Sequence, residues 1–177
     1  MPHSAGPLPI PEASSSWLDQ RHYADLDPSA ERALRAAGLS WHHEVEAERQ
    51  LGAAERAAPM HMAVAVAQYR YRLYKHRFQE AGAYAAKCLS LASAALGFPD
   101  DFRLVTSAHA DFAAFEPRVR FWLFALQAYG YVLLRCGRGG EGTSVLGKVV
   151  ELDRDDQTKT RALIDVIARA GRDDDSR

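Results

Sequence analysis

Apolar side chains recur every three to four positions through most of this chain, the spacing that places them on one face of an α-helix. Turns that contain glycine or proline interrupt the pattern several times. Between these turns the pattern predicts helices over residues 28–37, 40–58, 60–76, 79–96, 118–136, 141–152 and 155–171. Residues 100–117 are less regular and predict only one or two amphipathic turns, whereas the apolar run 121–134 predicts a buried core helix. The sequence therefore predicts an all-α fold.

Residues at the predicted helix ends have side chains that stabilise such ends. Asp27 is expected to cap the first helix, with Pro28 at its first position, and Gly38 is expected to end it in a left-handed conformation. Ser40 is expected to cap the second helix, and Asp155 the last one. These signals support the helix bounds independently of the apolar pattern.

Length and composition favour a single helical domain. Of the 177 residues, 47% are hydrophobic, which is enough for one compact core. The abundance of Ala, Leu, Arg and Glu favours helices over strands. We expect this domain over residues 27–171, preceded by a disordered or extended arm at 1–26 and followed by a disordered acidic tail at 172–177.

The charge of the chain is nearly balanced. With a formal net charge of −1, the protein has no overall field that attracts nucleic acid or an anionic membrane. The first residues do not form a secretory signal, and the longest apolar run is shorter than the about 20 residues that cross a bilayer. Cys88 and Cys136 lie far apart in the sequence, a pattern that fits free thiols in a reducing cytosol. We therefore expect a cytoplasmic protein that binds neither nucleic acid nor membrane.

The segment 125–155 resembles the tetratricopeptide repeat, a helix hairpin that recurs with a period of about 34 residues. In that family a small residue on the first helix, here Gly130, is followed by a glycine-containing turn. A second small residue, here Gly142, then lets the two helices approach closely. The same register fits residues 62–95 less closely, and a degenerate copy covers residues 28–61.

The resemblance implies a right-handed α-α superhelix of about three helix pairs, closed by the last helix as a C-terminal cap. The two better copies lie farther apart in the sequence than one repeat unit of about 34 residues. The excess is an insertion of about 27 residues, roughly 96–121. Short stacks of this kind leave apolar ends exposed, which would favour a homodimer formed through one end of the stack.

Members of the family bind an extended peptide or a partner helix on the concave face, which the first helix of each pair lines. The resemblance therefore implies a partner-binding groove at the matching positions Arg70, Tyr74, Gln127, Tyr131 and Arg135. Aromatic rings beside arginines provide a large contact area and engage carboxylates, so an acidic protein or peptide partner would suit this surface. The alternative is that the insertion covers the large side chains of this face.

No enzyme motif is present, since the sequence lacks a phosphate loop, a nucleophile elbow and a dinucleotide fingerprint. We therefore expect no catalytic activity and no cofactor. His42 and Glu46 lie four positions apart, which on one helical face could chelate a metal with His43 or His109 as a third donor. This spacing leaves a metal-binding or redox accessory protein as an alternative.

The chain is also similar to small repeat proteins encoded alongside bacterial nitrogen-fixation genes, in segments such as 42–48 and 120–135. This resemblance implies an accessory or assembly role near nitrogenase. The two resemblances together favour a protein-binding scaffold or assembly factor. A secretion chaperone built on the same repeats is a further alternative.

Overall fold

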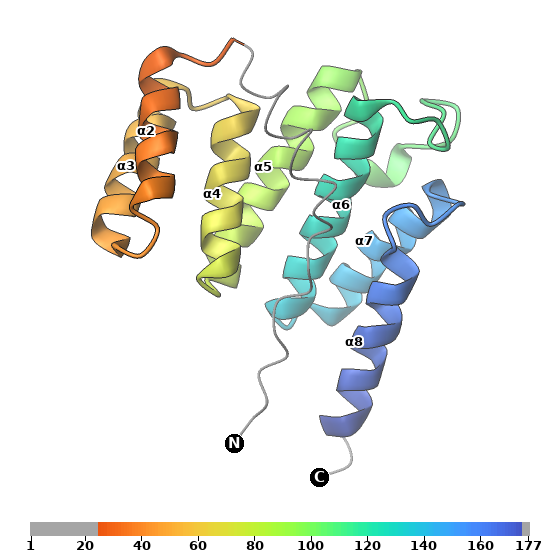
Figure 1. Ribbon diagram of the computed structural model, residues 1–177. Helices are drawn as coiled ribbons and strands as arrows, with labels where there is room; N and C mark the ends of the chain where they lie inside the picture. Colours follow the sequence, from red (N-terminus) through yellow and green to blue (C-terminus); the bar gives the residue numbers. More distant parts are fainter. Residues whose placement is uncertain (1–24, 175–177) are drawn as a thin grey trace. The chain divides into compact units, whose positions relative to one another are not determined.

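The computed structural model describes the backbone of residues 25–174 and the side chains of residues 25–169. Within this range the chain forms seven α-helices, one short 3₁₀ helix and no strand, which confirms the predicted all-α fold (Figure 1). The helix bounds are α2 (Pro28–Leu39), α3 (Glu44–Ala57), α4 (Met62–Tyr74), α5 (Phe78–Leu96), η1 (Phe102–Leu104), α6 (Pro117–Arg135), α7 (Gly139–Leu152) and α8 (Thr160–Asp174). None of the described helices combines the length and the apolar character that crossing a membrane requires.

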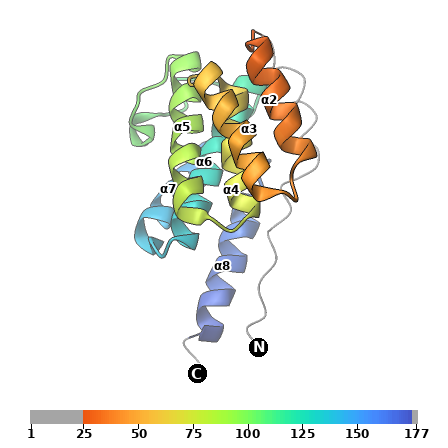
Figure 2. The same cartoon turned by 90° about the vertical axis from the view of Figure 1, so that its left-hand side faces the viewer.

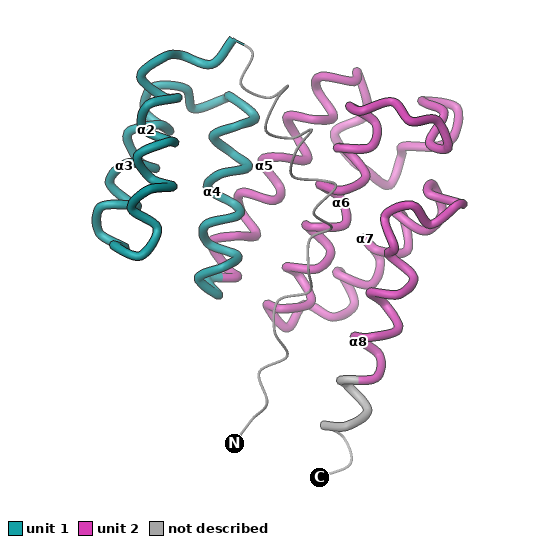
Figure 3. The backbone as a smooth tube through the Cα atoms, in the orientation of Figure 1, with its two compact units in different colours: residues 1–77 teal, residues 78–177 magenta. Residues whose placement is uncertain are grey.

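The chain divides between Arg77 and Phe78 into two compact units, drawn in different colours in Figure 3. Unit 1 contains α2, α3 and α4, and unit 2 contains α5, η1, α6, α7 and α8. The expectation of one domain over residues 27–171 stays a prediction. The predicted arm, residues 1–26, lies outside the described residues except for Asp25 and Leu26.

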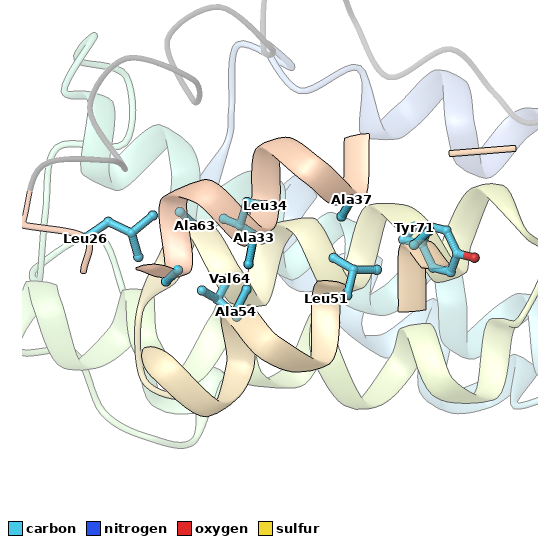
Figure 4. Close-up of a cluster of buried hydrophobic side chains, with 11 residues drawn as sticks. Leu26, Ala33, Leu34, Ala37, Leu51, Ala54, Ala63, Val64 and Tyr71 are labelled. Carbon is cyan, nitrogen blue, oxygen red and sulfur yellow. The ribbon is translucent and has the colours of Figure 1, made fainter. Parts of the chain in front are cut away.

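Unit 1 is held together by small side chains. Its helices α2 and α3 run side by side, as Figures 1 and 2 show. The buried side chains between its three helices are more than half alanine, and most of them are labelled in Figure 4. The cluster consists of Leu26, Ala30, Ala33, Leu34, Ala37, Ala47, Leu51, Ala54, Ala63, Val64 and Tyr71. Because alanine loses no side-chain entropy in a helix, such a core combines close packing with strong helix formation.

The first helix begins as predicted but ends differently. Asp27 caps α2 by accepting a hydrogen bond from the Ser29 backbone N–H at 2.7 Å, and Pro28 occupies the first helical position. The prediction that Gly38 ends this helix in a left-handed conformation is wrong. Gly38 lies inside α2, which continues to Leu39, and it is not among the glycines with positive φ.

The second helix begins later than predicted, because residues that the apolar pattern assigned to it form a turn. Its first residue is Glu44, and Ser40 instead caps the end of α2. The ring of Trp41 packs edge-on against Tyr71 and Tyr74 of α4, with centroid distances of 5.3 and 5.9 Å. Trp41, whose apolar side chain suggested a helix, therefore packs from the turn onto α4.

Unit 2 is built around Trp122 of α6, whose side chain is fully buried. Its indole Nε1 donates a hydrogen bond to the Ser93 hydroxyl of α5 at 2.8 Å. The rings of Phe98 and Phe112 lie 5.3 and 6.1 Å from the Trp122 ring. Both phenylalanines belong to the predicted insertion, roughly 96–121. Its residues 97–116 form only η1 and irregular turns, as expected, whereas residues 117–121 already belong to α6. The insertion is therefore a packed part of unit 2.

The hairpin of α6 and α7 closes through two glycines that face each other. A Cβ atom added at Gly130 would lie 2.9–3.0 Å from side-chain atoms of Leu146 and Val145. A Cβ added at Gly142 would lie 2.6 Å from Leu134 Cγ and 2.8 Å from the backbone oxygen of Gly130. Real Cβ atoms do not approach other atoms this closely, so the two helices touch only because both positions lack a side chain. Both glycines therefore lie at the close contact of α6 with α7.

The last helix begins at Thr160, so the prediction of a cap at Asp155 is wrong. Residues 153–159 instead form a connection in which Asp156 and Lys159 have positive φ angles of 49° and 59°. The helix continues to Asp174, beyond the predicted end at Gly171, and residues 175–177 of the predicted tail lie outside the described residues.

Replacing Gly142 by alanine should therefore destabilise the protein. Overpacking of a core costs about 1–3 kcal/mol. The cost for this substitution should lie in the upper part of that range, since one of the clashes is with a backbone oxygen. After the gain in helix propensity of about 1 kcal/mol, we expect the free energy of unfolding to fall by about 1–2 kcal/mol. Urea denaturation followed by circular dichroism measures this change.

Gly147→Ala is the matched control, because Gly147 is exposed on the same helix and nothing lies within 4 Å of an added Cβ. This variant should gain about 0.5–1 kcal/mol from helix propensity alone. If both variants gained stability equally, the close approach of the two helices would not be a constraint on the fold.

Candidate partner-binding surfaces on α4 and α6

The five residues predicted to line a groove lie on two helices that belong to different units. Arg70 and Tyr74 are on α4, and Gln127, Tyr131 and Arg135 are on α6. Within each helix they are spaced by four positions, so each set occupies one face of its helix.

On α4, the two predicted residues differ in their surroundings. Tyr74 is 38% exposed, and its ring packs edge-on against Trp41. Arg70 is half-buried, and no ion pair joins it to another described residue. Next to Tyr74, the Lys75 ammonium forms an ion pair with Glu44 at 3.0 Å. This end of unit 1 therefore presents aromatic rings and basic groups together.

On α6, the side chains of Tyr131 and Arg135 contact each other. Arg135 Nη1 donates a hydrogen bond to the Tyr131 hydroxyl at 2.8 Å. The same guanidinium lies over the ring of Phe78, the first residue of α5, with its central carbon 4.2 Å from the ring centroid. Arg135 is exposed, while the two rings are half-buried. The sequence predicted Tyr131 and Arg135 as contact residues but not Phe78, because the contact of Phe78 with Arg135 depends on how α5 pairs with α6.

Gln127 has a structural role that the sequence did not indicate. Its amide nitrogen donates hydrogen bonds to the Thr158 backbone oxygen and to the Thr160 hydroxyl, both at 2.9 Å. These bonds join the middle of α6 to the beginning of α8. The side chain of Gln127 is therefore engaged within unit 2 and does not act as an unoccupied groove position.

A buried ion pair lies near Gln127, between Arg120 of α6 and Asp153 at the end of α7. The two side chains are 7% and 2% exposed, and Arg120 Nη1 lies 3.5 Å from Asp153 Oδ1. Asp153 also accepts hydrogen bonds from the backbone N–H and the hydroxyl of Thr158, both at 2.7 Å, and from the Gln157 N–H at 3.2 Å.

These contacts determine the ionisation of Asp153. Burial by itself would raise the pKa of the Asp153 carboxyl, but the hydrogen bonds from Thr158 and Gln157 and the charge of Arg120 outweigh it and lower that pKa. Asp153 is therefore ionised in the folded protein and organises the connection between α7 and α8.

The expectation that His42 and Glu46 share one helical face, where they could chelate a metal, is wrong. Because α3 begins at Glu44, His42 lies in the preceding turn and does not share a helical face with Glu46. Glu46 accepts hydrogen bonds from Arg49 at 2.6 and 2.8 Å and from Gln50 at 2.8 Å, which lower its pKa to about 2.

The two proposed third metal donors belong to different units. His43 is the exposed residue that precedes the first turn of α3, and His109 lies in unit 2, where its Nδ1 accepts a hydrogen bond from the Thr106 N–H at 3.1 Å. Among the residues that the structure describes, no group of three or more His, Cys, Asp or Glu could hold a metal ion.

The Asp153 network leads to a prediction for stability. Asp153→Asn should leave Arg120 as a buried charge without a counterion, and we expect the free energy of unfolding at pH 7 to fall by about 2–4 kcal/mol. Since the folded-state pKa of Asp153 is lowered, its contribution is present above the unfolded value of about 3.9 and is lost as the pH falls further. The difference between wild type and variant, measured by urea denaturation, should therefore shrink below about pH 4.

Asp155→Asn is the control, because Asp155 is an exposed carboxyl in the same connection. Its stability should stay within about 0.5 kcal/mol of wild type. Equal stabilities of the Asp153 and Asp155 variants at pH 7 would contradict the role of the buried pair.

No protein-family model matches the chain, and no solved structure matches it. One curated protein does, the "Uncharacterized 19.8 kDa protein in nifW 5'region" of Azotobacter chroococcum mcd 1. The two sequences are 36% identical over 127 residues, which cover 71% of this chain and 71% of that protein. The chain therefore belongs to the family of this nifW-region protein.

Proposed function

We propose that this protein is an interaction scaffold or assembly factor of the tetratricopeptide type, which binds a partner polypeptide and has no catalytic role or cofactor of its own. The proposed contact residues of unit 2 are Tyr131 and Arg135 on α6, and those of unit 1 are Arg70 and Tyr74 on α4. The same proposal includes a right-handed superhelix of about three helix pairs, closed by a C-terminal cap. It also includes a cytoplasmic location.

The observation that supports the proposal best is the α6–α7 hairpin. Gly130 and Gly142 occupy the two positions at which tetratricopeptide hairpins need small residues, and both lie at a close helix contact. In that family the first helix of the pair contacts the ligand. Tyr131 and Arg135 lie on the corresponding helix here, and the Arg135 side chain is exposed.

The relative supports a place for this function in nitrogen fixation. The name of that protein places it in the 5' region of nifW. We therefore propose that the partner is a protein produced under nitrogen-fixing conditions, and that the scaffold is accessory to that process. A secretion chaperone built on the same repeats would instead bind one unfolded client.

Affinity capture of the tagged chain from its native host, grown with and without fixed nitrogen, tests the proposal. We expect wild type to capture a specific protein in the nitrogen-fixing culture, identified by quantitative mass spectrometry. The Tyr131→Ala, Arg135→Ala double variant should capture at least about tenfold less, because aromatic and arginine contacts are each worth about 2 kcal/mol or more where they dominate an interface.

The control is Arg138→Ala, which removes an exposed arginine from the turn after α6 and should leave capture unchanged. Circular dichroism of each variant verifies that it folds. Equal capture by wild type and the double variant would move the binding surface elsewhere. Failure of wild type to capture any protein above an unrelated bait would end the scaffold proposal, and capture of one exported protein would favour the chaperone.

A further inference from the structure

The guanidinium of Arg135 is held in a fixed orientation. It lies 4.2 Å from the centroid of the Phe78 ring and 5.8 Å from that of Tyr131, and one of its nitrogens donates to the Tyr131 hydroxyl at 2.8 Å. An arginine side chain ordinarily loses about 2 kcal/mol of rotamer entropy when it is immobilised. Here the contacts with the two rings and the bond to Tyr131 favour one orientation before a partner binds, although the side chain is exposed.

Most of the hydrogen-bonding capacity of this guanidinium is unused within the chain. A guanidinium has five N–H donors, and the one hydrogen bond from Arg135 to a described residue is the bond to Tyr131. No ion pair joins Arg135 to an acidic side chain within the described residues. By contrast, Arg138 in the adjacent turn donates two hydrogen bonds to Glu141, at 2.8 and 2.6 Å.

The helix end alone does not explain this arrangement. A positive charge in the last turn of a helix is stabilised by the macrodipole, by about 0.3–1 kcal/mol. That effect accounts for a basic residue near the end of α6, but a lysine or a freely moving arginine would satisfy it equally. It does not account for a guanidinium oriented by two rings, one of which comes from another helix.

We propose that Phe78, Tyr131 and Arg135 form a receptor for a carboxylate side chain of an acidic partner peptide, a cluster termed here the α6 arginine site. The planar fork of a guanidinium matches a carboxylate through two parallel hydrogen bonds, and a fork that is already oriented loses less entropy on binding. The half-buried ring of Tyr131 gives the apolar part of the same peptide a contact surface, while the ring of Phe78 orients the guanidinium. This inference rests on the proposed function and specifies the partner chemistry.

Selection from a random peptide phage library on the immobilised full-length protein tests the site. Peptides enriched on wild type should contain Asp or Glu at one fixed position. For the best peptide, exchange of that residue for its amide should weaken binding by roughly tenfold to a hundredfold, as fluorescence anisotropy measures. For Arg135→Gln the same exchange should change the affinity less than about twofold, since the partner of the carboxylate is gone.

Two further variants separate charge from orientation. Phe78→Leu keeps an apolar side chain but removes the ring face, and it should reduce the discrimination between acid and amide while thermal unfolding shows that the chain still folds. Arg138→Gln removes a neighbouring arginine that already has a partner, and it should leave the discrimination unchanged.

The outcomes distinguish the site from the function. Peptides that bind wild type with no preference for an acidic residue would overturn the α6 arginine site and leave the scaffold proposal standing. Acid discrimination that persists in Arg135→Gln would also overturn it. If no peptide were enriched above an unrelated control protein, peptide binding by this chain and the site would both be contradicted.

Discussion

The close contact of α6 with α7 is the constraint on which the candidate surface of unit 2 depends. Gly130 and Gly142 allow a separation that any side chain at either position would prevent. An α-helix turns by about 100° per residue, so Tyr131 and Arg135 lie about 100° and 140° around α6 from Gly130. Because the glycine face is fixed against α7, these two side chains cannot rotate toward it. The same contact that closes the hairpin therefore positions Tyr131 and Arg135 on a face of α6 where the Arg135 guanidinium lies over the Phe78 ring of α5.

The two halves of α6 have different surroundings. In the N-terminal half, Trp122 contacts α5 and the insertion, and Arg120 forms an ion pair with Asp153 at the end of α7. In the middle of the helix, Gln127 donates hydrogen bonds to Thr158 and Thr160. In the C-terminal half, Arg135 remains exposed. The face of α6 is therefore covered in part, and the groove stays a prediction for the exposed end of the helix. The covering of Arg120 and Gln127 comes from the residues before α8, whereas the insertion packs on the tryptophan.

The sequence predicted those features that depend on local spacing. The helices, the irregular insertion and the two contact glycines follow from periodicity and from the repeat register. The beginning of α3 was missed because Trp41 packs against Tyr71, which lies far away in the sequence. The beginning of α8 was missed because Asp153, a side chain at the end of α7, organises the residues that follow it.

In the candidate site, too, local spacing predicts only contacts within one helix. A spacing of four identifies Tyr131 and Arg135 as neighbours on one face, since the helix itself brings them together. It does not identify Phe78, whose ring reaches Arg135 only because α5 lies along α6. The spacing also places Gln127 on the same face but does not show that Thr158 and Thr160 accept its hydrogen bonds. Local periodicity therefore gives the face of a residue, while its role depends on the segment that packs there.

Short-range contacts should dominate recognition by this protein. The formal net charge is −1, and many charged side chains are paired with a neighbour on the same helix, as in Arg35 with Glu31 and Lys148 with Glu151. Such pairs have little field beyond the Debye length of about 8 Å at physiological ionic strength. An approaching partner is therefore steered weakly, and its selection depends on groups that it touches directly. An oriented guanidinium with unused donors provides that kind of selectivity, because a carboxylate satisfies its fork and a neutral side chain does not.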